Sequence, residues 1–271
     1  MTSGARSSRA VALVVTALSA ACAPRLMKLP SGTGQPAPDA RAAFDEATAA
    51  CRRVTTLTAE VAAAGSVGGQ GLRGRLLVGV AAPDSARVEA VAPFGQPLFI
   101  LVARGDDATL LLPRDERVLE HGQTAAVLEA LAGVPLDGAG LRTSLAGCAE
   151  MTDNGSPLAF GQNWRVIGDG RTEVYLTRDK PSLPWRLAAV LHRTPGRPVW
   201  RAEYRELKDG LPRSVRFASS DTSQFDLRLT LSQVEINTTL GSEAFTVQIP
   251  SGVRPISIDE LRHARPGVRQ D

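Results

Sequence analysis

Histidine, cysteine and aromatic residues are scarce in this sequence. Among 271 residues there are three histidines and three cysteines, and the aromatic content is 4%. The histidines lie far apart, and the sequence motifs of zinc proteases, serine hydrolases, P-loop enzymes and dinucleotide-binding enzymes are absent. We therefore predict that the protein is not an enzyme and that it has no catalytic residue, no metal site and no cofactor.

Runs of charge of one sign are absent as well. The net charge is +3, and basic and acidic residues are interspersed along the chain. Nucleic-acid-binding surfaces need clustered basic residues, often with aromatic residues between them, so we expect no nucleic acid partner. The arginines between Arg186 and Arg205 are typical of the solvated face of strands, and contact with anionic lipid is the alternative.

Two cysteines lie within the body of the chain. Cys51 and Cys148 fit neither a zinc spacing nor a redox motif. In an oxidising compartment they could form a disulfide, and two separately buried thiols are the alternative. The third cysteine, Cys22, follows a stretch with the character of an export signal.

That stretch has the parts of a secretory signal. Arg6 and Arg9 form a basic start, residues 10–18 are apolar, and small residues follow at 19–21. The apolar part is too short to span a bilayer as a helix. The sequence therefore predicts a cleaved signal peptide over residues 1–21.

The end of this signal resembles a bacterial lipobox. The stretch in question is Leu18-Ser19-Ala20-Ala21-Cys22, in which leucine stands four residues before the cysteine where the usual pattern has three. The resemblance implies that Cys22 becomes the first mature residue and carries acyl chains such as palmitate. Ala23 in place of an aspartate implies sorting to the outer membrane, with the protein facing the periplasm, and ordinary secretion is the alternative.

Residues 22–38 are expected to be a flexible tether between the lipid anchor and the folded body. This segment is rich in proline and glycine and has little apolar periodicity. Asp39 then follows as a candidate cap for a helix from Ala40 to about Arg53. We expect residues 39–271 to form one domain, since all-β domains of this length occur.

Beyond that helix the apolar residues recur with a period of two, which is typical of strands. Short turns between successive strands require antiparallel pairing. Two helices, at 124–131 and 139–146, are too short to be stable alone, so both are expected to lie on the sheet. The expected strands are 57–61, 72–80, 87–92, 98–102, 109–112, 117–120, 163–167, 172–177, 185–192, 198–207, 213–218, 227–236 and 245–249.

These elements together predict an α+β fold that is mostly β. Two details refine this prediction. Apolar residues change parity within the strand 227–236, which predicts a bulge near Ser232 or Gln233 and hence a curved sheet. Ser257 and Glu260 form a capping box that predicts a short C-terminal helix. A curved sheet that does not close has a concave face, which helices or a ligand must cover.

The turn between residues 92 and 98 places a large apolar side chain at its tip. Pro93, Gly95 and Pro97 favour a turn, because proline fixes φ and glycine supplies backbone freedom. Phe94 would then be exposed to a membrane, or it would fold back over the end of the sheet. Single apolar residues on loops are common, so composition alone does not choose between the two.

Residues 70–147 resemble the outer-membrane lipoprotein receptor family LolB. The stretch Ala92-Pro93-Phe94-Gly95 is similar to the Asn-Pro-Leu-Gly loop of that family. The stretches Val127 to Leu136, Leu141-Arg142 and Leu145-Ala146-Gly147 are similar to its helix, Gly-x-Pro turn and second helix. The resemblance implies an open half-barrel of antiparallel strands, lidded by short helices, with a hydrophobic cavity for acyl chains.

The resemblance also implies a function and a set of site residues. The protein would accept acylated lipoproteins from a LolA-type periplasmic carrier and help to insert them into the outer membrane as a monomer, with Pro93, Phe94 and Gly95 as the membrane-insertion loop. The alternatives are a non-catalytic structural or interaction lipoprotein of the envelope and a periplasmic sensor with the same fold. The expected cavity residues are Leu76, Val78, Ala90, Ile100, Leu111, Val127, Leu128 and Leu131.

Overall fold

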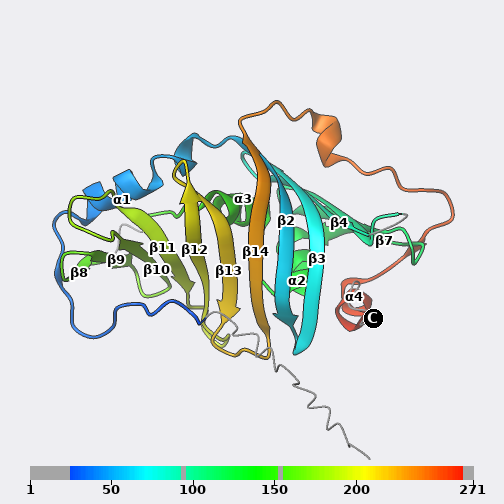
Figure 1. The fold of residues 1–271 in the computed structure, drawn as a ribbon. Helices are drawn as coiled ribbons and strands as arrows, with labels where there is room; N and C mark the ends of the chain where they lie inside the picture. The colour runs from blue at the N-terminus through cyan, green and yellow to red at the C-terminus, as the bar shows by residue number, and fades with distance from the viewer. Residues whose placement is uncertain (1–24, 93–95, 152–154, 265–271) are drawn as a thin grey trace, which may run out of the picture.

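The computed structural model describes residues 25–92, 96–151 and 155–264, which form a single large sheet with a few helices (Figure 1). The helices are α1 (Ala40–Thr48), α2 (Thr124–Ala132), α3 (Gly138–Ala146) and α4 (Ile258–Ala264), with 3₁₀ turns η1 (Cys51–Arg53) and η2 (Ser242–Phe245). The strands are β1 (Gln35–Pro36), β2 (Thr56–Val67), β3 (Gln70–Ala81), β4 (Ser85–Val91), β5 (Phe99–Arg104), β6 (Asp107–Leu112), β7 (Arg117–Gln123), β8 (Leu158–Phe160), β9 (Trp164–Gly168), β10 (Thr172–Thr177), β11 (Arg186–His192), β12 (Trp200–Lys208), β13 (Leu211–Ser219), β14 (Phe225–Ile236) and β15 (Arg254–Pro255).

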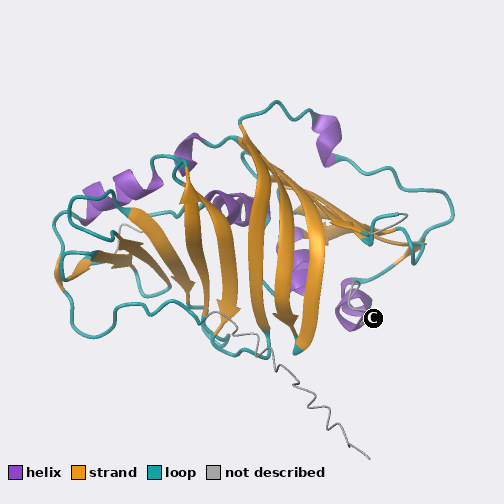
Figure 2. Cartoon of the chain, viewed as in Figure 1, coloured by secondary structure: helices purple, strands orange, loops and turns teal. Residues whose placement is uncertain are grey.

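The fifteen strands follow one another in the order β1, β8 to β14, β2 to β7, β15. All neighbours pair antiparallel except β15, which runs parallel to β7. The last long strand, β14, returns to pair with β2 and so joins the two runs of strands at the centre of the sheet (Figure 2). The sheet is curved and does not close, as the sequence predicts, and its two edges are the two-residue strands β1 and β15.

A bulge in β14 contributes to the curvature. The pairing of β14 with β2 shifts between Ser232 and Glu235, and Gln233 adopts a positive φ of 49°. An extra residue on one strand bends that strand and increases its local twist. The change of parity in the sequence therefore located this bulge correctly.

The hydrophobic core lies on the concave face. Val61, Val80, Leu110 and Leu176 point to this face and are almost completely buried. Helices α2 and α3 lie against it behind the central strands, and α4 packs against α2 (Figure 1). Within the described ranges, no helix is both long and apolar enough to cross a membrane.

Helix α1 begins at Ala40 as expected, but Asp39 does not cap it. Asp39 precedes α1, yet its side chain makes no capping hydrogen bond. Its two carboxylate oxygens accept hydrogen bonds from Nε and Nη2 of Arg165, both at 2.7 Å. This bidentate pair lowers the pKa of Asp39, and it ties the start of α1 to β9.

The tether expected over residues 22–38 is not what the structure shows for residues 25–38. Gln35 and Pro36 pair with β8, and the amide of Ala37 donates to the carbonyl of Pro157 at 3.0 Å. Ala37 is buried in the main core. Proline-rich sequence can follow a surface in an extended form as well as span water, and its lack of periodicity does not tell the two apart.

The strand expected at residues 245–249 is also absent. Phe245 ends η2, which contacts β4 and β5, and is buried, and the chain beyond it lies beside Val102 and Thr109 without pairing. Arg87 Nη1 donates to the carbonyls of Ala244 and Thr246, at 3.2 and 2.8 Å. Of the alternating apolar residues there, Phe245 is buried and Ile249 is exposed, so the alternation predicted a strand that the structure does not contain.

The C-terminal capping box is confirmed. The amide of Glu260 donates to Ser257 Oγ at 3.2 Å, and the amide of Ser257 donates to Glu260 Oε2 at 2.9 Å. These reciprocal bonds satisfy amide groups at the start of α4. They lower the pKa of Glu260, because backbone and hydroxyl donors stabilise its charged form.

Candidate functional site

An apolar cavity lies between the concave face of the sheet and helices α2 and α3. Its volume is about 150 Å³. Aliphatic side chains form nearly all of its wall, and the charged residues beside it are Arg73 and Arg75. The other lining residues are Val61, Ala63, Leu72, Gly74, Leu76, Val78, Val88, Ala90, Val91, Leu98, Phe99, Leu128, Leu131, Ala132, Val134, Leu136, Leu141, Leu145, Phe217, Leu227 and Leu229.

The strand register determines which residues of the sheet form the wall of the cavity. Leu76 pairs with Ala90, and Ala90 pairs with Phe99, so these three side chains stand in a row across β3, β4 and β5. Val78 and Val88 form the next row. Because paired residues in an antiparallel sheet point to the same face, one row of apolar residues in each strand builds a continuous apolar surface.

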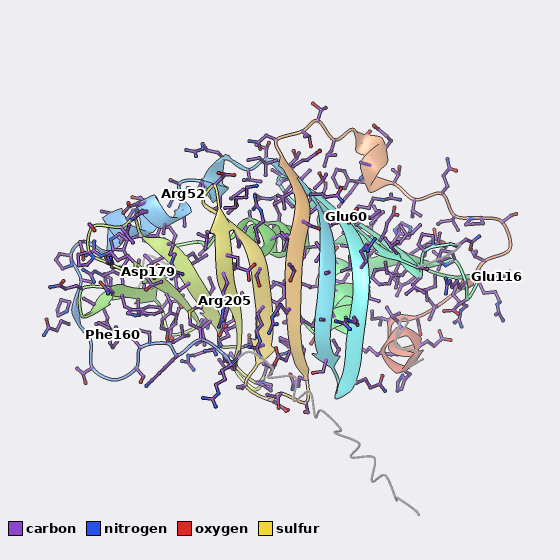
Figure 3. All side chains as sticks on the ribbon, viewed as in Figure 1. Arg52, Glu60, Glu116, Phe160, Asp179 and Arg205 are labelled. Atoms are coloured by element: carbon purple, nitrogen blue, oxygen red, sulfur yellow. A yellow bond between two sulfur atoms is a disulfide. The ribbon has the colours of Figure 1, made fainter. Side chains whose placement is uncertain are left out.

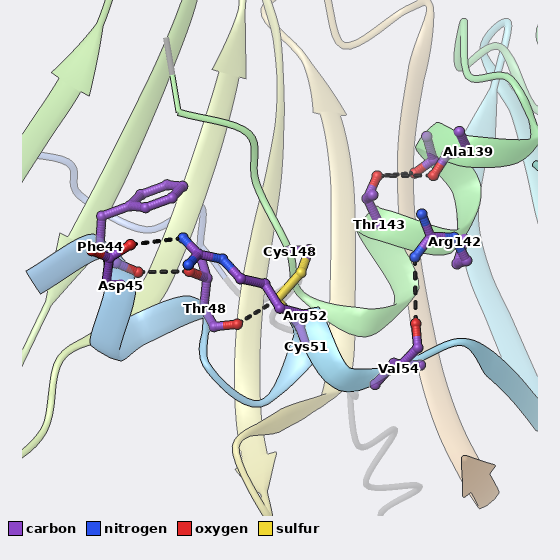
Figure 4. Close-up of a disulfide and its surroundings, with 11 residues drawn as sticks. Phe44, Asp45, Thr48, Cys51, Arg52, Val54, Ala139, Arg142, Thr143 and Cys148 are labelled. Atoms are coloured by element: carbon purple, nitrogen blue, oxygen red, sulfur yellow. Dashed lines mark hydrogen bonds and ion pairs between the residues drawn. A yellow bond between two sulfur atoms is a disulfide. The ribbon is translucent and has the colours of Figure 1, made fainter. Parts of the chain in front are cut away.

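Helix α3 is held in place at both ends. At its start, Asp137 Oδ1 accepts a hydrogen bond from the amide of Gly140 at 2.7 Å. Gly138 lies so close to the carbonyl of Asp84 that a Cβ there would fall 2.2 Å from the oxygen. Just after its end, Cys148 is joined to Cys51 by a disulfide, with a Cα–Cα distance of 5.5 Å (Figure 4).

Helix α2 has fewer fixed points. Gly133 ends it with a φ of 73° and lies beside Phe225 and Val67. At its start, Thr124 Oγ1 donates to the carbonyl of Gly105 at 3.0 Å. On the surface, Glu129 Oε1 accepts a hydrogen bond from Arg197 Nη1 at 2.8 Å, and the helix otherwise lies against β6, β7 and α4. Of the two helices over the cavity, α2 is therefore the one held by weaker local constraints.

The rim of the cavity is open near the start of β3. Leu72, Leu76, Phe99 and Leu131 are only partly buried and pack against the core. A Cβ built on Gly74 would find no atom within 4 Å. Val91 and Leu98 also line the cavity, so the loop between β4 and β5 leaves and rejoins the sheet at the cavity wall.

Five of the eight expected cavity residues line it: Leu76, Val78, Ala90, Leu128 and Leu131. Ile100 and Leu111 do not, because they pair with each other on the opposite face of β5 and β6. Helices cover one face of these strands, and the segment after β14 covers the other. Both faces are therefore apolar, and apolar residues alone did not show which face is concave. Val127 is fully buried but packs toward β7, where its Cγ2 lies beside Gly122.

Sequence reasoning missed other lining residues. Leu141 and Leu145 come from α3, and Leu227 and Leu229 come from β14. The signal for them was present, since each lies on the apolar stripe of its own element. What the sequence did not supply was the pairing of β14 with β2, which brings a distant strand to the cavity. Cys22, Pro93, Phe94 and Gly95 lie outside the described residues.

The chemistry of the cavity is that of an apolar binding site. No acidic, histidine or cysteine side chain lines it, and in the part of the chain that the structure describes no cluster of such residues could hold a metal ion. On the other side of α3 is a more polar pocket of about 360 Å³ that includes His192 and Tyr204. Burial lowers the pKa of His192 to about 4, so this imidazole is neutral at neutral pH.

No family model and no curated protein matches this sequence. Among solved structures, a LolA superfamily protein from Nitrosomonas europaea is similar, with a TM-score of 0.53 and 13% identity, over 77% of this chain and 97% of that chain. A putative outer membrane lipoprotein-sorting protein domain from Vibrio parahaemolyticus has a TM-score of 0.48 at 13% identity, over 76% and 97%. A DUF1329 family protein from Desulfovibrio piger has a TM-score of 0.48 at 12% identity, over 77% and 97%. The first likeness shows the fold, which is the LolA/LolB-type fold that the sequence resemblance implies.

Proposed function

We propose that this protein, on a fold shared with the LolA superfamily protein, binds the acyl chains of lipoproteins and helps to insert them into the outer membrane. The observation that carries the proposal is the apolar cavity between the sheet and helices α2 and α3. The sheet acts as an open half-barrel, and the two helices act as its lid. The protein is a non-enzymatic carrier or receptor, because binding and release of an acyl chain need no bond to be made or broken.

Binding requires the cavity to widen. Ligand sites usually measure about 300 to 1,000 Å³, and this cavity measures about 150 Å³. Helix α3 is fastened by its cap and by the disulfide, so α2 is the element that moves away from the sheet. Each methylene of the ligand that leaves water contributes about 0.8 kcal/mol, and burial of a long chain outweighs the loss of packing around α2.

Release is directed toward the membrane by two parts of the chain, the lipid anchor and the loop between β4 and β5. Acylated Cys22 anchors the protein to the outer membrane on its periplasmic side. The loop of Pro93, Phe94 and Gly95 then inserts into the bilayer beside the cavity rim. Burial of one phenylalanine is worth about 1.5 to 3 kcal/mol, which orients an anchored protein but does not anchor it.

The partners in this proposal are an acylated lipoprotein and a LolA-type periplasmic carrier, and the protein works as a monomer. The test is transfer of a labelled triacylated lipoprotein from such a carrier to this protein and on to liposomes. Phe94→Glu is expected to keep uptake and to lose delivery. Ile236→Glu is the matched control, because Ile236 is an exposed apolar residue far from the cavity wall, and it is expected to keep both steps.

A structural or interaction lipoprotein of the envelope is the second candidate, and the small cavity volume favours it. In that case the core side chains already fill the concave face, and α2 does not move. Failure of uptake by a folded protein from a carrier that serves another receptor would support this candidate and refute the first. Uptake without delivery by wild-type protein would instead indicate a periplasmic sensor or carrier.

A further inference from the structure

The N-terminal segment from residue 25 to residue 29 is fastened to the outer face of the sheet. In Figure 1 it belongs to the dark-blue line at the lower left. The amide of Met27 donates to Glu203 Oε1 at 2.8 Å, and Arg205 Nη2 donates to the carbonyl of Arg25 at 3.2 Å. Met27 and Leu29 pack on the apolar patch around Tyr175 and Ala189.

Glu203 makes this attachment specific. Its side chain is completely buried, and it forms ion pairs with Arg201 at 2.8 Å and with Arg205 at 3.3 Å. A buried carboxylate is tolerated only when its oxygens are paired and hydrogen-bonded. The amide of Met27 supplies one of those hydrogen bonds. The N-terminal segment therefore helps to satisfy a buried carboxylate of the sheet.

A groove of about 670 Å³ opens beside this attachment, and three arginines and two acidic residues are among its lining residues. Arg178, Arg186 and Arg205 line it with Met27 and Trp164, against the acidic Asp179 and Glu206. Figure 3 labels Arg205 and Asp179. Arg25 and Lys28 are exposed on the segment, and Lys180 is exposed in the loop that bears Arg178. Arg25, Lys28 and Lys180 add positive charge beside the groove, so basic residues outnumber Asp179, Glu203 and Glu206 on this surface.

If Cys22 is acylated, the short stretch of chain between Cys22 and Arg25 limits the distance of this surface from the membrane. Cys22 stands three residues before Arg25, and three residues reach at most about 10 to 11 Å. The electrostatic attraction of basic side chains to anionic lipid acts within a Debye length, about 8 Å at physiological ionic strength. A lipid anchor at Cys22 therefore holds the surface around Arg25 within reach of the headgroups.

We infer that the outer face around the N-terminal segment is a membrane-docking surface for anionic lipid headgroups. This basic surface consists of Arg25, Lys28, Arg178, Lys180, Arg186 and Arg205. The inference rests on the proposed acylation of Cys22, and for Arg186 and Arg205 it takes the alternative interpretation, contact with anionic lipid, over that of a solvated strand face. It brings the β9 to β12 part of the sheet close to the bilayer in the anchored protein.

The test uses the full chain as matured in bacterial membranes, purified and reconstituted into vesicles. Mass spectrometry first establishes whether Cys22 is acylated. Hydrogen–deuterium exchange then compares vesicles of phosphatidylcholine alone with vesicles that also contain phosphatidylglycerol. Residues 178–186 are expected to exchange several-fold more slowly with phosphatidylglycerol and to lose that protection at high salt, while the β6–β7 turn at 113–116 remains unchanged.

Two variants make the result specific. Lys28→Glu/Lys180→Glu alters exposed lysines and is expected to abolish the protection with the fold intact by circular dichroism. Arg53→Glu/Arg254→Glu makes the same change of charge at exposed positions elsewhere and is expected to retain it. If Cys22 is acylated but residues 178–186 show no protection, or show equal protection in both kinds of vesicle, the docking surface is overturned and the proposed function is not. An unmodified Cys22 would overturn the anchor of the proposed function and this inference with it.

Discussion

At the scale of single residues, His192 links stability to pH. Its ring stacks on Trp200 with a centroid distance of 4.1 Å, and burial lowers its pKa to about 4 from an ordinary value of 6.5. Between these values the unfolded chain binds a proton that the folded chain does not, so stability falls as pH falls through this range. Below pH 4 the loss attributable to His192 approaches about 3 kcal/mol.

We predict that His192→Gln is less sensitive to acid than the wild type. Urea unfolding from pH 7 to pH 4 measures this, because carboxylates such as Asp39 contribute equally to both proteins and cancel in the difference. The variant has a lower free energy of unfolding at pH 7, since it loses the stacking on Trp200, and the gap narrows toward pH 4. Parallel curves for the two proteins would show that His192 protonates freely in the folded state.

Gly74 gives a prediction about the cavity itself. It points toward the cavity, and a Cβ there meets no atom within 4 Å. Gly74→Phe is therefore expected to block the rim and to weaken binding of a fluorescent fatty acid at least tenfold, while the melting temperature is unchanged or raised, because glycine is unfavourable within strands.

Gly71→Phe is the matched control for this change. Gly71 lies on the same strand and also has open space around its Cβ, but its position in the alternation of β3 places it on the outer face. It is expected to leave fatty acid binding unaltered. Equal loss in both variants, or no loss in either, would mean that acyl chains do not enter past Gly74.

At the scale of elements, the disulfide distinguishes the two helices over the cavity. Cys51 and Cys148 are 97 residues apart in the sequence and tie the segment after α1 to the segment after α3. Removing a disulfide that closes a loop of this length costs about 2 to 5 kcal/mol. The double variant Cys51→Ala/Cys148→Ala is expected to lose that much stability in urea unfolding.

The same variant tests which helix is the fixed one. Amide exchange in α3 is expected to accelerate more than exchange in α2, because only α3 is tied by the bond. Reducing agent should destabilise the wild type to a similar degree and leave the double variant unaffected. Equal acceleration in both helices would mean that α2 depends on α3 and does not open alone.

Most of the elements could be predicted from the sequence, since their signals are local. Gly133 and Gly147 end the two cavity helices at left-handed positions, and the change of parity located the bulge in β14. Ile100 and Leu111 were assigned to the wrong face because both faces of their strands are apolar and covered. Residues 25–29 were expected to be a tether because their attachment depends on Glu203, which is 176 residues from Met27 and gives no local signal.

At the scale of the whole molecule, the path of the chain explains how two distant regions share one cavity. Strand β14 joins β13 to β2, so residues near 61, 76 and 227 enclose the same space. On the outer face, the segment from residue 25 to residue 29 covers β9 to β12, and η2 contacts β4 and β5. The concave face is thereby left to the helices and the cavity.

The two edge strands limit pairing of this sheet with other chains. An open sheet exposes hydrogen-bonding edges onto which another chain can grow, and this is a common start of aggregation. Here β1 and β15 are two residues long, and each contains a proline, Pro36 and Pro255, which has no amide hydrogen to donate. Both edges of this open sheet are therefore poor templates for pairing with another chain.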